Sequence, residues 1–242
     1  MKGFMYHNFV LAKICILEVC GLQALLVFLW AVLAILSKGE TLNQETLVGY
    51  AIVGGAMLLC SFLFTEFISG EIFKQSEGAS WCSFAMTTPG SVIDYMSAKY
   101  EFVFMTDLLT LFLWVMTDVV LLAINPNFIS IQSIAFILWA FQLLLHALEL
   151  VSSTGFGATM GGYVKYGFIG VLIFAAIIYA LYGDLSFFKQ DNPLEALMKI
   201  IEESKALYWF INLLPGIAVA VYLASYKLAV KIYRKGAANY EQ

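Results

Sequence analysis

Charged residues are scarce in this sequence. They make up 12% of the 242 residues, and Arg234 is the single arginine. An ordinary soluble domain is about 25% charged and about 45–50% apolar, whereas 62% of this chain is hydrophobic and its mean hydropathy is +0.85. The net charge is −4 and no basic patch is interleaved with aromatics, so the chain is not expected to bind nucleic acid.

Motifs for catalysis and cofactor binding are also missing. No GxxxxGK[ST] sequence is present, so this chain cannot hold ATP in the Walker manner. The four cysteines form no CxxC pair and are expected to be small buried hydrophobes. His146 and Glu149 alone are too few ligands for zinc, and no serine or cysteine nucleophile is evidently paired with them. We therefore expect no catalytic residue, metal or cofactor, and the N-terminus shows no removable signal peptide.

Long hydrophobic runs are what the sequence has instead. A helix that spans the bilayer needs about 20 mostly apolar residues, and six such runs are present. The sequence therefore predicts an all-α, polytopic membrane protein in which residues 1–242 form a single transmembrane domain. The expected spans are residues 15–36, 47–68, 102–124, 131–152, 166–183 and 207–226.

Basic residues set the expected orientation. If both termini are cytoplasmic, nine Lys and Arg residues lie on the cytoplasmic side and four on the outer side. Cytoplasmic loops carry an excess of Lys and Arg. The N- and C-termini are therefore expected in the cytoplasm.

Three segments outside these spans have features of their own. Residues 1–14 mix apolar and polar side chains, which predicts a short interfacial helix leading into the first span. Residues 193–205 begin with a proline and repeat apolar residues at helical spacing, which predicts an amphipathic helix on the outer face. Whether this helix is a gate or a packed surface helix stays open. The glycines of residues 153–165 predict a flexible inner loop.

Two predicted spans place polar residues on one helix face. Asp107 and Asp118 are eleven residues apart, close to three full turns, so both point the same way. Gln142, His146 and Glu149 form a stripe in the following span. Because the two spans run in opposite directions, Asp107 is expected at a depth similar to that of His146 and Glu149. The residues expected to line a substrate path are Asp107, Trp114, Gln142, His146 and Glu149.

Two interpretations of these ionisable groups compete, because charge inside a bilayer is costly. One is an acid-lined vestibule, open to the cytoplasm and attractive to a cationic or amphipathic substrate. The other is a set of polar pairs between helices, worth about 0.6 kcal/mol each on average. For Glu18 and Glu66, near the inner ends of the first two spans, we favour the structural interpretation. For Asp107, His146 and Glu149 both interpretations stay open.

The connection between the second and third spans, residues 70–100, has the most distinctive order of features. The polar residues KQSEG precede Trp81, an apolar turn SFAMTTP follows, and SAKY leads into the next span. This order resembles the segment D-E-K-x-x-W-x-x-Y/F-A-x-x-x-P-x-S/T followed by S-K-Y in permeases of the ABC-2 superfamily of small bacterial ABC exporters. The matching residues are Glu77, Trp81, Phe84, Ala85, Pro89, Ser91, Lys99 and Tyr100.

The resemblance implies the transmembrane permease subunit of an ATP-driven exporter in the bacterial plasma membrane, a subunit that is not itself an enzyme. Residues 70–100 would be a coupling segment that grips a separate ATPase subunit, which holds ATP and Mg. A second permease chain, identical or different, would complete the path within the membrane lipid. The expected substrate is hydrophobic or amphipathic, with peptides of the toxin or lantibiotic type first. The expected coupling residues are Lys74, Gln75, Glu77, Trp81, Phe84, Thr87, Pro89 and Ser91.

Three alternatives stay open beside this hypothesis. Residues 70–100 could form an interfacial helix in which Trp81 lies at the level of the lipid headgroups. The chain could be a proton-coupled secondary transporter that uses Asp107, His146 and Glu149 as a relay. It could also be an immunity or sensor protein that binds a peptide without moving it.

Overall fold

The computed structural model describes residues 2–36, 44–78, 91–126, 130–182 and 204–240. These residues form long α-helices, and no strand occurs among them, which confirms the all-α prediction. The helices are α1 (Lys2–Leu36), α2 (Gln44–Gly78), α4 (Ser91–Ile124), α5 (Gln132–Phe156), α6 (Ala158–Tyr182) and α8 (Lys205–Tyr240).

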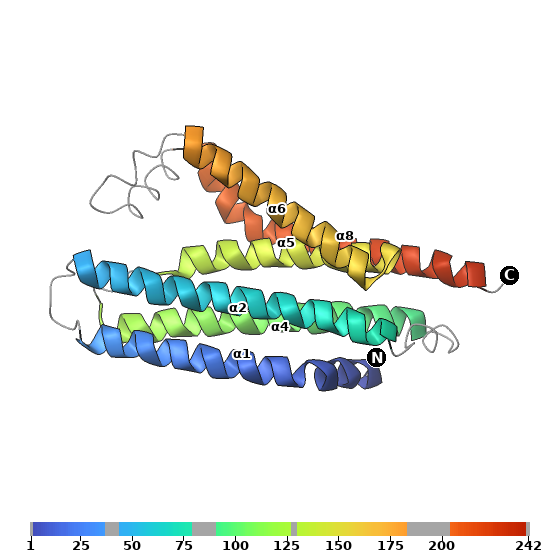
Figure 1. The fold of residues 1–242 in the computed structure, drawn as a ribbon, viewed down its shortest axis with the longest axis horizontal. Coiled ribbons are helices and arrows are strands. Elements are labelled where there is room, and N and C mark those ends of the chain that lie inside the picture. The colour runs from blue at the N-terminus through green and yellow to red at the C-terminus, as the bar shows by residue number, and fades with distance from the viewer. Residues whose placement is uncertain (1, 37–43, 79–90, 127–129, 183–203, 241–242) are drawn as a thin grey trace.

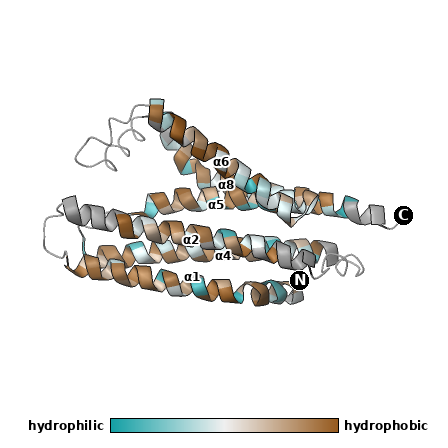
Figure 2. Cartoon of the chain, viewed as in Figure 1, coloured by the Kyte–Doolittle hydropathy of each residue, from teal (hydrophilic) through white to brown (hydrophobic). Residues whose placement is uncertain are grey.

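Each of these six helices is long and apolar enough to cross a membrane, as expected of a multi-pass membrane protein. Figure 2 shows hydrophobic residues along most of the length of the bundle. At 1.5 Å per residue, helices α1 and α2, with 35 residues each, are about 50 Å long. The hydrocarbon core of a bilayer is only about 30 Å thick. These helices therefore continue beyond the apolar layer.

The helices lie side by side with α5 near the centre (Figure 1). Helices α1, α2, α4 and α5 run closely together, while α6 and α8 pack on α5 and then diverge from the other four. Both chain termini, the last turn of α2, the first turn of α4 and the α5–α6 junction lie at the same end of the bundle. We call this end the termini end.

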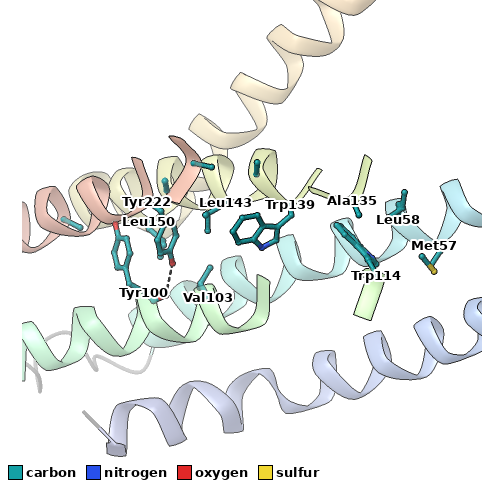
Figure 3. Packing of buried hydrophobic residues seen from close by; sticks show 14 of the residues in the cluster. Met57, Leu58, Tyr100, Val103, Trp114, Ala135, Trp139, Leu143, Leu150 and Tyr222 are labelled. Carbon is teal, nitrogen blue, oxygen red and sulfur yellow. Dashed lines mark hydrogen bonds between the residues drawn. The ribbon is translucent and has the colours of Figure 1, made fainter. Parts of the chain in front are cut away.

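Large aromatic side chains fill the space between these helices. Trp114 and Trp139 are almost fully buried, together with Leu143, Tyr100 and Tyr222 (Figure 3). Burial of this kind is the main contribution that helices make to one another's stability in water, but lipid tails are as apolar as leucine. In a membrane, close packing and polar contacts between helices carry more of the stability.

The first 14 residues do not form a separate interfacial helix, contrary to expectation. They are the beginning of α1, which runs without a break from Lys2 to Leu36. The Asn8 amide donates a hydrogen bond of 3.3 Å to the Ala98 carbonyl of α4, and the Phe4 ring meets the Tyr95 ring edge-on at 5.4 Å. Contacts with α4 thus hold this segment as part of the bundle.

The prediction of a flexible inner loop at residues 153–165 is also wrong. Helix α5 ends at Phe156 and α6 begins at Ala158, so the connection is Gly157 alone. Gly157 has φ 89°, a left-handed conformation that glycine adopts without a steric penalty, and its N–H donates to the Ser153 carbonyl at 2.9 Å. The other glycines of this stretch belong to the helices, and α6 therefore begins eight residues earlier than the predicted span.

The one-residue connection between α5 and α6 requires a glycine at position 161, inside α6. A Cβ atom at Gly161 would lie 2.7 Å from the Ser153 backbone nitrogen, closer than real Cβ contacts permit. The absence of a side chain lets the first turn of α6 approach the last turn of α5. The amphipathic helix predicted at residues 193–205 lies outside the described residues, apart from its last two positions.

The Gly161→Ala variant should be destabilised, because the added methyl group meets the Ser153 backbone as well as its side chain, and the backbone cannot move aside. We expect a loss of about 1–3 kcal/mol, the usual cost of overpacking, seen as a lower melting temperature in detergent. Gly167→Ala is the matched control, since nothing lies within 4 Å of its Cβ position on the same helix. Equal melting temperatures for the two variants would contradict the close approach.

Candidate functional site

Four helices bring five ionisable side chains together inside the bundle. None of the five is more than 5% exposed. We call this group the ionic cluster. It consists of Glu66 from α2, Asp107 from α4, His146 and Glu149 from α5, and Lys165 from α6.

Lys165 lies at the centre of the carboxylates. Its ammonium nitrogen is 2.7 Å from Glu66 Oε2 and 2.8 Å from Glu149 Oε2. The Ser69 hydroxyl donates a further hydrogen bond of 2.6 Å to the same Glu149 oxygen. Helices α2, α5 and α6 are thus joined through one ammonium group.

His146 lies between the carboxylates of Asp107 and Glu66. Its Nδ1 is 2.9 Å from Asp107 Oδ2, and its Nε2 is 3.4 Å from Glu66 Oε1. A neutral imidazole has one N–H donor and one acceptor nitrogen, whereas both nitrogens donate in imidazolium. A carboxylate oxygen thus lies near each ring nitrogen, although the Nε2 contact with Glu66 does not have hydrogen-bond geometry. His146 then joins α4 to α2 as Lys165 joins α6 to α2.

The charges of the cluster do not balance. Its three carboxylates face one lysine and one histidine, so one negative charge remains even with His146 protonated. Asp107 Oδ1 is buried and has no hydrogen-bond partner among the described residues. An unpaired charge in an apolar interior is costly and is commonly neutralised by taking up a proton. The cluster therefore has the composition of a site that shares protons among its members.

A metal ion fits this cluster less well than the lysine does. Glu66, His146 and Glu149 offer three ligand atoms within 4.8 Å of one another, a donor set that transition metals accept. However, the Lys165 ammonium already lies within 2.8 Å of both glutamates and supplies the positive charge there. A divalent cation would have to displace it.

Hydroxyl and amide groups extend the polar contacts along α2. Gln142 of α5 donates to the Thr65 hydroxyl, and Ser61 donates to Gln23 of α1. Ser61, Thr65 and Ser69 follow one another at intervals of four, so they share one face of α2. This spacing is the signal in the sequence that indicates a polar face on an otherwise apolar α2.

The structure brings together four of the five residues expected to line a substrate path. Asp107, His146 and Glu149 belong to the ionic cluster, and Gln142 lies one turn before His146 on α5. The expected similar depth of Asp107 and His146 is confirmed by their 2.9 Å contact. Trp114 instead belongs to the apolar core, in the same cluster as Leu58 (Figure 3). Glu66 is a central member of the cluster. Lys165, which the sequence predicts to lie in the inner loop, is the member that the sequence does not indicate.

The burial of these groups argues against an open vestibule in this conformation. Their side chains are in contact with one another, and each is at most 5% exposed in the part of the chain that the structure describes. An acid-lined path would leave carboxylates accessible to a cationic substrate. The structure instead favours the interpretation of polar pairs between helices for Asp107, His146 and Glu149.

Asp118 has a different position and a clear structural role. The Ser130 hydroxyl donates to Asp118 Oδ2 and the Ile131 N–H donates to Asp118 Oδ1, both at 2.8 Å. These donors lie at the start of α5, where backbone N–H groups have no partner within the helix. A negative charge at this position is also favoured by the helix dipole. Asp118 of α4 thus caps α5 from a neighbouring helix.

The predicted coupling residues fall mostly beyond what the structure describes. Trp81, Phe84, Thr87 and Pro89 lie outside the described residues. Lys74, Gln75 and Glu77 belong to the last turns of α2, and Ser91 is the first residue of α4, but only their backbone is described. Their proposed role stays a prediction.

Replacing Lys165 with methionine should be strongly destabilising, because two buried carboxylates lose their cation. Removing one partner of a buried ion pair costs about 3–5 kcal/mol, which thermal melting in detergent would detect. The added substitution Glu149→Gln should restore part of the loss, since it removes one of the stranded charges. Lys227→Met, at an exposed position of α8, is the control. If Lys165→Met melts like this control, the ion pairs do not support the bundle.

Comparison with known proteins adds no relative. The chain was compared with protein-family models, with curated proteins and with solved structures, and nothing matches in any of the three.

Proposed function

We propose that this chain is the transmembrane permease subunit of an ATP-driven ABC-2-type exporter that works with a separate ATPase subunit. The observation that supports this most directly is the course of α2 and α4. These helices flank the segment that resembles the family's coupling segment, and the end of one and the start of the other lie together at the termini end (Figure 1). A cytoplasmic ATPase would meet the chain at such an end.

Basic residues at the termini end support a cytoplasmic orientation. Lys99 and Lys165, two of the nine basic residues counted for the cytoplasm, are buried in the bundle and say little about orientation. Without them, seven Lys and Arg residues lie on the cytoplasmic side and four on the outer side, which still favours cytoplasmic termini. The last turns of α8 contribute an exposed basic stripe of Lys227, Lys231, Arg234 and Lys235.

The ionic cluster would let the bundle transmit a movement of the coupling segment. Glu66 is 12 residues before the end of α2 and Asp107 is 16 residues after the start of α4, or about 18 Å and 24 Å along the helices. Both carboxylates contact His146 of α5. A push on the ends of α2 and α4 would thus reach α5 through direct polar contacts as well as through apolar packing.

The exposed side chains fit a chain that works with a second permease. Helix α6 is largely apolar and has little of its surface buried within this chain, and α8 is similar. Lipid or a second permease chain, identical or different, would cover these faces. The substrate class, a hydrophobic or amphipathic molecule with peptides first, rests on the resemblance of residues 70–100.

Loss of the Trp81 side chain should separate the ATPase from the chain. Large aromatic residues that fill a groove on a partner dominate many interfaces, so Trp81→Ala should reduce co-purification of the ATPase about tenfold or more. The measurement is affinity purification of the tagged chain from its native membranes, followed by identification of a stoichiometric subunit with a GxxxxGK[ST] motif. Trp209→Ala, at a position that is 62% exposed near the other end of α8, is the control.

Retention of the ATPase by the Trp81→Ala variant would reject the coupling role of this segment. Absence of any Walker-motif subunit from the wild-type preparation would reject the exporter proposal as a whole. The two results are distinguishable, because the first leaves a complex to assay and the second does not.

A second candidate function is proton-coupled transport without an ATPase, and the geometry of His146 favours it over the sensor alternative. Contacts run from Asp107 through His146 to Glu66, and on through Lys165 to Glu149. Such a chain of groups with surplus negative charge is suited to passing a proton. It requires that the buried cluster becomes accessible from both sides.

Liposomes that contain the purified chain alone would test this second candidate. A pH gradient should drive proton entry, reported by an internal pH-sensitive dye, and Asp107→Asn should abolish it because the histidine loses its carboxylate partner. Asp118→Asn is the matched control, since Asp118 contacts no member of the cluster. Proton entry no faster than in protein-free liposomes would contradict proton coupling.

A further inference from the structure

A cavity of about 220 Å³ lies between α4 and α8, separate from the ionic cluster. Tyr100, Glu101 and Phe104 come from α4, and Tyr222 and Tyr226 come from α8. Tyr100 and Tyr222 form its buried floor, while Leu223 at its edge is 56% exposed. The cavity is therefore reached from the outer surface of the bundle.

The aromatic rings of this cavity are held in place by one another and by hydrogen bonds. Ring centroids are 5.2 Å apart for Tyr100 and Tyr222, and 5.3 Å apart for Tyr100 and Tyr226. The Tyr222 hydroxyl donates to the Tyr100 carbonyl at 2.8 Å (Figure 3), and the Tyr226 hydroxyl is 2.7 Å from the Ser97 hydroxyl. Since these hydroxyls have partners, the rings present mainly their aromatic surfaces to a ligand.

Glu101 is the unusual member of this group. It lies within the apolar segment Ile93–Ile124 that can span the membrane, and it is only partly exposed. Among the described residues no hydrogen bond or ion pair involves its side chain. A carboxylate beside aromatic rings and without a protein cation has the chemistry that attracts a cation from outside.

We propose that this cavity binds the cationic group of an amphipathic organic molecule, such as a quaternary or tertiary ammonium. The Glu101 carboxylate supplies the opposite charge, and the tyrosine and phenylalanine rings supply cation–π contacts. The apolar part of the ligand extends past Leu223 along the surface between α4 and α8. The ammonium group thus replaces water at the Glu101 carboxylate and neutralises its charge.

The size of the cavity limits what can enter it. Pockets for drug-sized ligands are about 300–1,000 Å³, so 220 Å³ accommodates a group of headgroup size and not a whole peptide. The cavity is therefore a recognition site for one cationic group rather than a translocation path. Its existence does not depend on the exporter proposal, since binding requires only this chain.

The binding of benzyltrimethylammonium to the purified chain in maltoside micelles tests the proposal. Isothermal titration calorimetry should show saturable binding, and Glu101→Gln should weaken it about tenfold or more, because the charge partner is lost. Glu18→Gln, an equivalent change at an exposed position of α1, should leave binding unchanged. The uncharged analogue carries a tert-butyl group in place of trimethylammonium. Its affinity for the wild-type chain should be no higher than the affinity of benzyltrimethylammonium for the Glu101→Gln variant.

A pair of variants at Tyr226 separates the aromatic contribution from general packing. Tyr226→Phe keeps the ring and should bind the probe like wild type, whereas Tyr226→Leu should weaken binding about fivefold. Size-exclusion chromatography and melting temperature would establish that each variant is folded. A folded Glu101→Gln variant with wild-type affinity, or equal binding of the uncharged analogue, would overturn the proposal, because the cavity would then be only an apolar crevice.

Competition distinguishes two sources of the same chemistry. Lysophosphatidylcholine carries a trimethylammonium group, and lysophosphatidylglycerol with the same acyl chain does not. Displacement of the probe by the choline lipid alone would assign the site to a lipid headgroup. No displacement by either lipid would assign it to a soluble amphipathic cation. Equal displacement by both lipids would overturn the assignment, since it would show that the acyl chain is what binds.

Discussion

The ion pairs of Lys165 with Glu66 and Glu149 are the contacts on which the arrangement of the bundle depends. In water the hydrophobic effect would hold these helices together, but in a membrane the separated helices would be equally well solvated by lipid. A buried ammonium that bridges carboxylates on two other helices has no comparable partner in the lipid. The pairing therefore specifies which faces of α2, α5 and α6 meet, and His146 extends the same specification to α4.

An ionic cluster of this kind determines which helix faces meet, but it does not necessarily raise the stability of the bundle. Taking charged groups out of water is costly, and replacing a buried ion pair by apolar residues is often neutral or stabilising. The cluster also has more carboxylates than cations. A protein that needed only a stable bundle could dispense with it. Its presence fits a protein whose helices must keep one register while the ends of α2 and α4 are moved, or whose function requires protons inside the bundle.

Local spacing in the sequence predicted some parts of this structure and could not predict others. The stripe of Gln142, His146 and Glu149 was predictable because helical period alone puts these residues on one face. Lys165 was not, because its place depends on where α6 begins. Glycine-rich sequences usually end helices, but here the glycines continue both α5 and α6, and only Gly157 departs from helical conformation, while Gly161 makes a close contact with Ser153 of α5. That contact joins two helices, so no periodic pattern in the sequence predicts it.

Polar contacts at two distant levels restrict how α4 can move against α5. Asp107 contacts the middle of α5 through His146, and Asp118 accepts hydrogen bonds from the two residues just before its first turn. Sliding α4 by one helical turn, about 5.4 Å, would break both sets of contacts at once and strand two buried carboxylates. Tilting the two helices together breaks neither. Helices α4 and α5 are therefore expected to move as one rigid body. A conformational change in this protein would rotate the two helices together and would not slide one along the other.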